Sequence, residues 1–243
     1  MSRMEENSID LVVTSPPYDD LRDYNKYSFD FDKVSSLLFK VIKVGGVLVW
    51  VVADTTKDCD ESGTSFKQAL AFKSLGFKLN DTMIYSKKNS PMPSKYKYYS
   101  NFEYMFVFSK IKCPVTVNLL KDKKNSCAGE VRKNSNVRTK DGIKFKKDRH
   151  LVIGEYGVRT NIWEYDVGWM KSYKDKFVSN HPAVFPEKLA EDHVLSWSNK
   201  GEIVYDPFMG SGTTLIVAKN NKRKFIGNEI NAEYYEYCKT KLF

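Results

Sequence analysis

The sequence predicts an α/β fold with a mainly parallel sheet that helices cover on both faces. Three observations support this prediction. Short apolar runs of strand length alternate along the chain with segments of helical periodicity. Some of the runs, such as residues 47–53, are apolar at every position, as strands buried on both faces are. Strands that alternate with helices favour parallel neighbours in a sheet with two covered faces.

The first expected strand, residues 9–13, is a β-branched apolar run that ends at T-S-P-P-Y, residues 14–18. Proline lacks the N–H that a sheet ladder needs, so the strand must stop near Ser15. The following residues then form a rigid turn, and a stiff turn without function is the plain interpretation. Ligands and chemistry usually lie at strand ends in α/β sheets, which makes this turn a candidate site.

A helix, a strand and a second helix are expected next. Residues 32–43 carry their apolar side chains on one helical face, and we expect Gly45 and Gly46 to end that helix. Residues 47–53 then form a buried strand. Residues 65–75 are again helical, and Gly76 stops them. The candidate core residues of the second helix are Phe66, Ala69, Leu70 and Phe72.

Residues 78–85 and 103–108 are typical of two further strands, separated by a loop rich in Ser, Pro, Lys and Tyr. The segment that follows has weak periodicity and many turn residues. We interpret it as an insertion into the fold rather than part of the core.

Regular structure is expected again from Pro186, which favours the first position of a helix. The apolar residues of that helix are Leu189, Val194, Leu195 and Trp197. Residues 203–205 form a short strand, residues 213–221 a helix and residues 224–227 another strand. Asn231 is the expected N-cap of a last helix.

Composition and cysteine usage exclude several classes of protein. The hydrophobic fraction of 42% and the aromatic fraction of 14% are typical of a globular chain. No apolar run approaches the roughly 20 residues that span a membrane, and the first residues lack the apolar stretch of a signal peptide. The four cysteines show neither C-x-x-C pairs nor zinc-ligand spacing with the three histidines. We therefore expect a cytoplasmic protein with reduced thiols and no metal site.

The excess positive charge is confined to one segment. Lys and Arg number 39 against 30 Asp and Glu, a net charge of +9, and residues 110–150 hold 13 of the former and 4 of the latter. All of the excess therefore lies there. Its Asn, Ser, Thr and Arg residues can reach phosphates and base edges, which indicates contact with nucleic acid rather than a solvated loop alone. The predicted DNA-binding residues are Lys121, Lys123, Lys124, Arg132, Arg138, Lys144, Lys146 and Lys147.

A second turn with functional potential is D-P-F-M-G-S-G-T-T, residues 206–214, between an expected strand and an expected helix. Gly210 and Gly212 let the backbone approach a ligand closely. Ser211, Thr213 and Thr214 can cap the helix, whose free N–H groups suit a carboxylate. The spacing matches neither a P-loop nor G-x-G-x-x-G, which argues against ATP, GTP and nicotinamide dinucleotides.

Glu229 lies 19 residues past Gly210, at the end of the next expected strand. An acid at that place in a nucleotide-binding βαβ unit accepts hydrogen bonds from ribose hydroxyls. By itself it would be an ordinary surface carboxylate. Together with the glycine loop it predicts a cofactor with a ribose, a carboxylate and no pyrophosphate, and S-adenosylmethionine is such a molecule.

S-P-P-Y and D-P-F-M-G-S-G-T together resemble the two signature motifs of DNA amino-methyltransferases. The catalytic motif comes first here, and this permuted order resembles the β group of that family. H-P-A-V-F-P, residues 181–186, is similar to the segment before the helix that packs over the methionine part of the cofactor. Residues 87–110, ending E-Y-M-F-V-F-S-K, resemble the stretch beside the target-base pocket.

The resemblance covers most of the chain apart from the basic insertion, and it implies a Rossmann-like S-adenosylmethionine-dependent methyltransferase fold. Residues 1–109 would be the catalytic part, 110–165 the target-recognition insertion and 166–243 the cofactor-binding part. The implied catalytic residues are Ser15, Pro16, Pro17 and Tyr18. The implied cofactor-binding residues are His181, Pro182, Ala183, Phe185, Asp206, Phe208, Gly210, Ser211, Gly212, Thr213 and Glu229.

Family members usually carry a short segment with Gly-Asp well before the S-P-P-Y strand. This sequence has no such segment, so we expect either a truncated start or another residue in its place.

The chemistry that the resemblance implies is direct methyl transfer. An exocyclic amine of a base is a poor nucleophile because its lone pair is conjugated with the ring. The Ser15 side chain and the Pro16 carbonyl can accept hydrogen bonds from that amine, and the two prolines fix these acceptors in place. Tyr18 gives a face on which the flipped target base can stack.

Serine before P-P-Y resembles the cytosine-N4 type, whereas Asp or Asn mostly marks adenine enzymes. We therefore predict methyl transfer to the N4 amine of cytosine in duplex DNA. Adenine N6 methylation is the first alternative, and a catalytically weak protein that binds DNA or cofactor is the second. Carbon-5 cytosine methylation is set aside because Pro114 follows Cys113 instead of preceding it. A generic oxidoreductase is disfavoured by the glycine spacing.

The expected partners are double-stranded DNA and a cognate restriction endonuclease, with no membrane partner. The oligomeric state stays open between a monomer and a homodimer.

Overall fold

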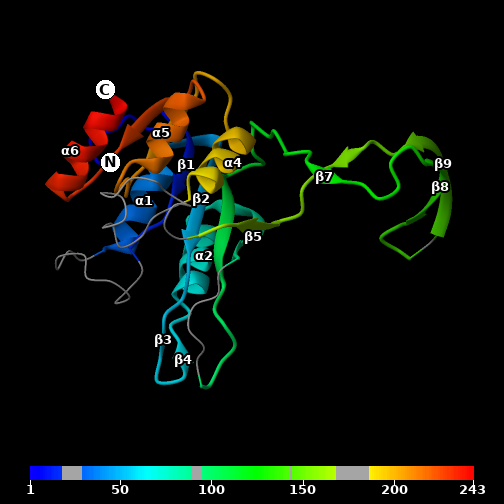
Figure 1. Ribbon diagram of the computed structural model, residues 1–243, viewed down its shortest axis with the longest axis horizontal. Helices are drawn as coiled ribbons and strands as arrows, with labels where there is room; N and C mark the ends of the chain where they lie inside the picture. The colour runs from blue at the N-terminus through cyan, green and yellow to red at the C-terminus, as the bar shows by residue number, and fades with distance from the viewer. Residues whose placement is uncertain (18–28, 89–94, 143, 168–185) are drawn as a thin grey trace. The chain divides into compact units, whose positions relative to one another are not determined.

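The computed structural model describes residues 1–17, 29–88, 95–142, 144–167 and 186–243, with the backbone alone at 133–138 and 144–149. Contacts divide the chain into two units. Unit 1 consists of Met1–Asn118 and Asn161–Phe243, and unit 2 of Leu119–Thr160. Each unit has its own sheets (Figure 1).

Unit 1 is built on a seven-stranded sheet. In sheet order its strands are β11 (Ile162–Tyr165), β5 (Phe77–Lys87), β6 (Phe102–Lys110), β2 (Ile42–Val52), β1 (Ile9–Thr14), β12 (Ile203–Asp206) and β13 (Lys224–Gly227). Strand β6 is antiparallel to both of its neighbours, and all other adjacent pairs are parallel. The prediction of a mainly parallel sheet is confirmed.

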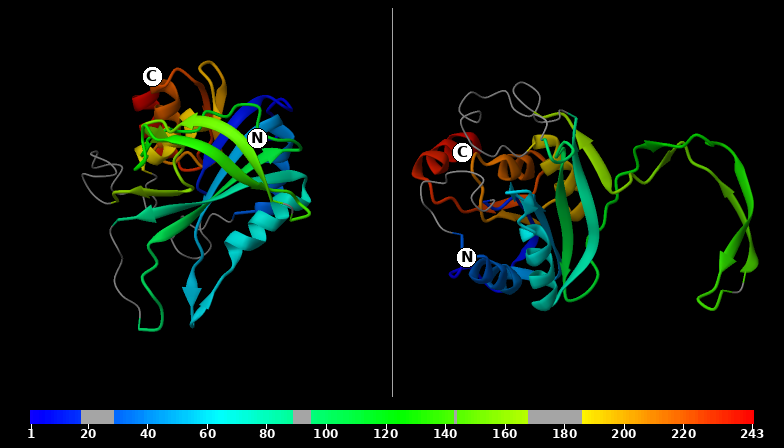
Figure 2. Two further views of the ribbon diagram at one scale, coloured as in Figure 1. Left: turned by 90° about the vertical axis from the view of Figure 1, so that its right-hand side faces the viewer. Right: turned by 90° about the horizontal axis from the view of Figure 1, so that it is seen from below.

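Helices cover both faces of this sheet, as predicted. They are α1 (Phe31–Val41), α2 (Thr64–Ser74), α4 (Glu187–Trp197), α5 (Thr213–Asn220) and α6 (Ala232–Leu242). Helices α1 and α2 lie on one face, and α4, α5 and α6 lie on the other (Figure 2). Asn231 caps α6, as expected, because its side chain accepts hydrogen bonds from the N–H groups of Glu233 and Tyr234. No helix in these described ranges is long and apolar enough to cross a membrane.

One cluster of buried residues lies between the sheet and the α1–α2 layer. Trp50 is fully buried, and its ring meets that of Phe72 edge to face with centroids 5.0 Å apart. Its indole N–H donates to Gln68 Oε1 at 2.8 Å, so the one polar atom of the ring is satisfied. This core fixes the positions of β1 and β2, whose ends carry the candidate site.

The core prediction for α2 is wrong at Phe66 and Leu70, which are 51% and 64% exposed. The buried face consists of Ser65, Gln68, Ala69 and Phe72. These positions follow the i, i+3, i+4, i+7 spacing of a single helical face. Two of them are polar, so a search for apolar residues alone selected the wrong phase of the helix.

The expected role of Gly45 and Gly46 as a helix stop is also wrong. Helix α1 ends at Val41, and both glycines lie within β2. The register of β2 against β1 shifts there, from the pair Ile9–Ile42 to the pair Leu11–Val47. A Cβ atom on Gly46 would lie 3.0 Å from the carbonyl oxygen of Asp10. The glycines therefore allow an irregularity of the strand next to β1.

Unit 2 contains two small antiparallel ribbons. One pairs β7 (Lys123–Lys124) with β10 (Tyr156–Gly157), and the other pairs β8 (Val131–Arg138) with β9 (Lys144–Val152). None of the unit 2 residues whose burial is described is buried. Residues 110–118 and 161–165, which we assigned to the insertion, group with unit 1, where Lys110 ends β6 and β11 pairs with β5. A further short hairpin of unit 1 joins β3 (Thr56–Lys57) and β4 (Asp60–Glu61).

Candidate active site

The two motifs singled out in the sequence meet at one edge of the sheet. Strands β1 and β12 are adjacent and parallel, and Val12 pairs with Tyr205. Both strands end two residues or less beyond this pair, so the S-P-P turn and the glycine loop begin side by side. The Thr14 hydroxyl donates a hydrogen bond of 2.6 Å to Asp206 Oδ1. This buried contact joins residues 192 positions apart in the sequence.

Asp206 anchors the beginning of the glycine loop. The N–H of Phe208 donates to Oδ1 of its carboxylate at 3.0 Å, in addition to the bond from Thr14. Burial raises the pKa of Asp206 to about 6, although hydrogen bonds from Thr14, Phe208 and Thr214 act in the opposite direction. The nearby Glu229 carboxylate contributes to the rise. The carboxylate thus holds together the two strand ends that carry the motifs.

The glycine loop has backbone angles that favour glycine. Gly210 and Gly212 have positive φ angles of 50° and 85°. A Cβ atom on Gly212 would lie 2.3 Å from Cys238 Sγ, so only glycine fits against α6 there. Gly212 is also the N-cap residue of α5.

The expected capping of α5 by side chains is wrong. No side chain caps α5 in the described structure. The Thr214 hydroxyl instead bonds toward Asp206 and the Val13 carbonyl, while Ser211 Oγ and Thr213 Oγ1 lie 3.4 Å apart. The N–H groups of the first helical turn therefore face no hydroxyl cap from this loop, and such groups suit a negatively charged ligand.

Glu229 lies beside the loop, as its spacing predicted. Its Oε2 accepts a hydrogen bond of 2.8 Å from Gly210 N, and its Oε1 accepts from the N–H groups of Ile230 and Asn231, each at 2.9 Å. The half-buried carboxylate ties the glycine loop to the start of α6. Because Oε2 receives a single bond, it retains capacity for a further donor.

The remaining residues of the two motifs differ in their surroundings. Pro16 is buried, and Ser15 and Pro17 are half-buried at the end of β1. The half-buried ring of Phe208 packs edge to face on Phe29 with centroids 5.3 Å apart, which places it against the aromatic core. The other predicted site residues, Tyr18, His181, Pro182, Ala183 and Phe185, lie outside the described residues.

Sequence reasoning missed Asp54, which follows β2 at the same edge of the sheet. Its Oδ1 accepts hydrogen bonds from Ser65 N at 2.9 Å and Ser62 Oγ at 3.2 Å, and its Oδ2 accepts from Ser65 Oγ. The carboxylate therefore fixes the first turn of α2 against the strand next to β1. An acid directly after a buried apolar run was the signal that could have identified it.

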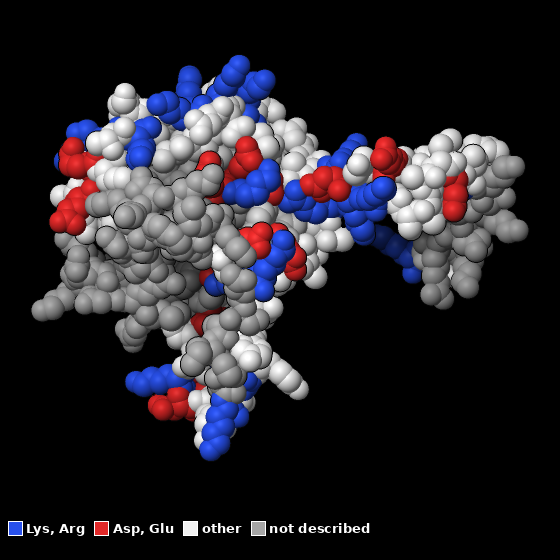
Figure 3. All heavy atoms as spheres, viewed as in Figure 1, with Lys and Arg blue, Asp and Glu red and all other residues white. Residues whose placement is uncertain are grey.

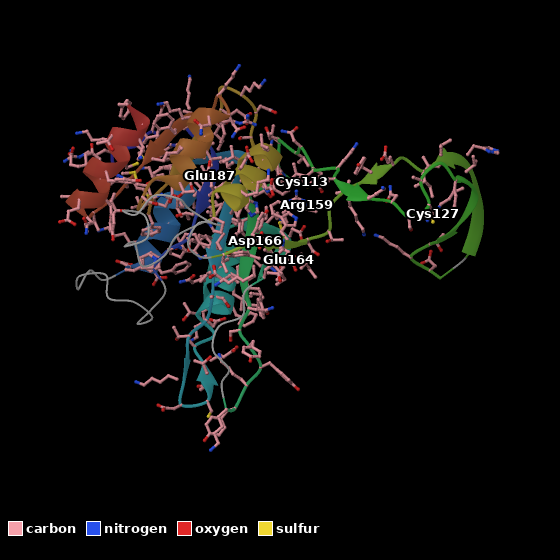
Figure 4. All side chains as sticks on the ribbon, viewed as in Figure 1. Cys113, Cys127, Arg159, Glu164, Asp166 and Glu187 are labelled. Carbon is pink, nitrogen blue, oxygen red and sulfur yellow. The ribbon has the colours of Figure 1, made fainter. Side chains whose placement is uncertain are left out.

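The predicted DNA-binding residues lie in unit 2. Lys121, Lys123, Lys124 and Arg132 are exposed, and Figure 3 shows Lys and Arg side chains gathered over β7. Arg138, Lys144, Lys146 and Lys147 lie on β8 and β9 by their backbone positions. Arg159, labelled in Figure 4, donates from Nε to Asp122 Oδ1 at 3.0 Å. This ion pair joins the two chain segments at the start and end of unit 2.

Comparison with known proteins gives consistent matches. The family model described as DNA methylase, which covers N6 and N4 enzymes, matches residues 9–240. The chain is 54% identical over 244 residues to the orphan methyltransferase M.BamHII of Bacillus amyloliquefaciens, covering 98% of this chain and 92% of that protein.

Solved structures with low sequence identity share the fold. The PvuII DNA methyltransferase, described as cytosine-N4-specific, matches with a TM-score of 0.69 at 20% identity, over 100% of this chain and 82% of that one. A complex of M1.HpyAVI with S-adenosylmethionine matches with a TM-score of 0.62 at 20% identity, over 99% and 90%. The predicted Rossmann-like methyltransferase fold is confirmed.

Proposed function

The chain belongs to the N6/N4 DNA methylase family, with the β-group order of motifs, and from this premise we propose that it methylates the N4 amine of cytosine in duplex DNA. S-adenosylmethionine is the methyl donor of this family, and DNA is the substrate. One observation carries the proposal. The S-P-P turn and the glycine loop leave adjacent strands and are joined by the 2.6 Å bond between Thr14 and Asp206.

The loop residues fit the cofactor. When bound, S-adenosylmethionine supplies a methyl group activated by its sulfonium sulfur. The first turn of α5 would hold its carboxylate, because no side chain caps that turn in the described structure. The free capacity of Glu229 Oε2 suits a ribose hydroxyl, and Gly210 and Gly212 keep the loop surface free of side chains.

The S-P-P-Y turn would act on the target amine. Ser15 Oγ and the Pro16 carbonyl accept hydrogen bonds from the amine, which favours a tetrahedral nitrogen with its lone pair available for the methyl group. The two prolines hold these acceptors rigidly, so little reorganisation is needed during the reaction. Tyr18 stacks on the base once it has left the duplex. The main contribution of the protein is then positioning.

The choice of cytosine rests on Ser15 before P-P-Y and on the likeness to a cytosine-N4-specific structure. Adenine N6 methylation is the first alternative, because the family model includes both types of enzyme. A protein that binds DNA or cofactor without turnover is the second. Each alternative uses the same fold, so the product must decide among them.

The test is to incubate the protein with methyl-labelled S-adenosylmethionine and duplex DNA and to identify the labelled nucleoside by mass spectrometry after digestion. The proposal expects N4-methylcytosine. Labelled N6-methyladenine would replace cytosine by adenine and leave the mechanism in place. DNA binding without any labelled nucleoside would favour the binding protein.

The proposed cellular location and protein partner follow from the DNA substrate. Chromosomal DNA lies in the cytoplasm of a bacterium, and we propose that location. A restriction endonuclease with the same recognition sequence is the proposed protein partner, because methylation would protect its sites. Both proposals rest on the DNA methyltransferase class.

A further inference from the structure

The backbone ladder between β1 and β12 stops just before the two motifs begin. Its last registered pair is Val12 with Tyr205. In the same register Thr14 would lie opposite Pro207, which has no N–H to donate to a ladder. The ends of the two strands must therefore be held together by contacts other than ladder hydrogen bonds.

Side chains make this connection. The buried Thr14 hydroxyl donates to Asp206 Oδ1 at 2.6 Å. The buried Thr214 hydroxyl, in the first turn of α5, also contacts Asp206 and lies 3.4 Å from the carbonyl oxygen of Val13. Asp206 thus contacts one hydroxyl from the strand before the S-P-P turn and one from the helix after the glycine loop. We call Thr14, Asp206 and Thr214 the strand-end bridge.

The S-P-P turn follows Thr14 directly and has a stiff backbone. Each proline fixes its own φ angle, and the residue before a proline is confined to extended backbone. Both restrictions act on Pro16, and the second acts on Ser15. The backbone of Ser15 and the carbonyl of Pro16 therefore keep one arrangement. Their position relative to the glycine loop is set where this stiff segment is attached, at Thr14.

Thr14 itself does not face a ligand. It is 1% exposed, and its hydroxyl proton is committed to Asp206. On its other side its backbone pairs with Trp50 of β2. A buried carboxylate needs donors, so a contribution to stability is the plain interpretation of this hydrogen bond. The place of Thr14 adds a second role, because direct methyl transfer depends steeply on geometry and a displacement of about 1 Å can cost about 10²-fold in rate.

We propose that Thr14 is a positioning residue for methyl transfer. Through Asp206 it fixes the S-P-P turn relative to the glycine loop, so that the target amine and the methyl donor meet in the reactive arrangement. Thr214 holds the same carboxylate from the side of α5. The proposal rests on the proposed methyl transfer, and it adds a residue that contacts neither the DNA nor the cofactor.

The test uses four variants of the full-length protein. Thr14→Val keeps the branched shape of the side chain and removes the hydroxyl, and Thr14→Ala removes both. Thr14→Ser keeps the hydroxyl. Ser196→Ala is the matched control, because it removes another buried hydroxyl, which donates to the Asp192 carbonyl at 2.6 Å within α4.

Three quantities are measured for the parent and each variant. Thermal unfolding identifies a temperature at which all the proteins are folded. At that temperature calorimetry gives the affinity for S-adenosylmethionine. The single-turnover rate of methyl transfer is then measured on unmethylated plasmid DNA, with cofactor and protein in excess over the sites. A change in stability alone affects only the first quantity.

The two variants without the Thr14 hydroxyl should lose about 10- to 100-fold of the single-turnover rate and keep near-parental affinity for S-adenosylmethionine. Thr14→Ser should recover most of the rate, and Ser196→Ala should keep the parental rate although it unfolds at a lower temperature. Thr14→Ala provides the same test if Thr14→Val does not fold.

The proposal is overturned by any of three results. The folded hydroxyl-free variants keep the parental rate, Thr14→Ser is as slow as they are, or the affinity for S-adenosylmethionine falls by as much as the rate. Methylated adenine in the product would contradict the choice of cytosine and leave the role of Thr14 to be decided by the same rates. A parent that transfers no methyl group would contradict both proposals.

Discussion

Units 1 and 2 differ in how they are stabilised and in where their charge lies. Unit 1 has a buried aromatic core around Trp50 and is nearly neutral, with 27 basic and 25 acidic residues. Unit 2 has no buried residue among those whose burial is described, and it holds 12 basic and 5 acidic residues. The packed core of unit 1 suits the rigid positioning that methyl transfer needs. The exposed basic surface of unit 2 suits contact with DNA phosphates.

The largest expected effect lies in unit 1, at Ser15. Ser15→Ala removes one preorganised acceptor for the target amine, so the rate of methyl transfer should fall by about 10²–10³. Affinity for S-adenosylmethionine and DNA should stay near the parental values, because Ser15 belongs to neither expected binding surface. Single-turnover kinetics and calorimetry measure the two quantities. A parental rate in Ser15→Ala would contradict the proposed mechanism.

The stability of unit 1 should depend on pH through Asp206. Its pKa is raised from 3.8 to about 6, so the folded state binds more protons than the unfolded state between these values, and stability falls as pH rises through that window. The loss is about 3 kcal/mol and is complete above the folded pKa. Urea unfolding at pH 4.5 and pH 7 measures about 2 kcal/mol of it, because the carboxyl of the unfolded chain is already mostly ionised at pH 4.5. In Asp206→Asn this part of the pH dependence should vanish, and a dependence equal to that of the parent would assign it to other groups.

A smaller effect is expected at Glu229. Glu229→Ala should weaken S-adenosylmethionine binding by about 1–3 kcal/mol, because ribose hydroxyls lose a charged acceptor. The carboxylate also holds three backbone N–H groups, so the variant should unfold at a lower temperature as well. Glu229→Gln, which keeps one acceptor oxygen, is the matched control. Unchanged affinity in a folded Glu229→Ala protein would leave Glu229 with the structural role alone.

The role of unit 2 in DNA binding is tested by the salt dependence of the affinity for DNA. Neutralising Lys121, Lys123 and Lys124 together should lower the slope of log K against log salt by roughly one unit for each lost phosphate contact. The control is the same change at Lys200, Lys222 and Lys224, which are exposed and lie at or just before the first residues of β12 and β13. Equal slopes in the two triple variants would show that the insertion is an ordinary solvated surface. Units 1 and 2 would then not differ in their contact with DNA.

Much of unit 1 was predictable from the sequence because its signals are local. Apolar runs, helical periodicity and caps placed β1, β12, β13 and α6 close to their observed bounds. The two turns were identifiable because glycine and proline act on the backbone within a few residues, and Glu229 was identifiable by its spacing from Gly210. Their roles as catalytic and cofactor motifs came from the resemblance to a family.

Other features depended on contacts between distant segments, which local patterns do not encode. The phase of α2, with polar Gln68 buried and Phe66 exposed, was set by the indole of Trp50 on another element. The role of Gly45 and Gly46 was set by the register between β1 and β2. The meeting of Thr14 with Asp206, and the burial that raises the pKa of Asp206, required β1 and β12 to be neighbours in the sheet. The sequence by itself thus determined the elements and the motifs, and the tertiary structure decided which of them touch, because burial and strand order arise only when the whole sheet assembles.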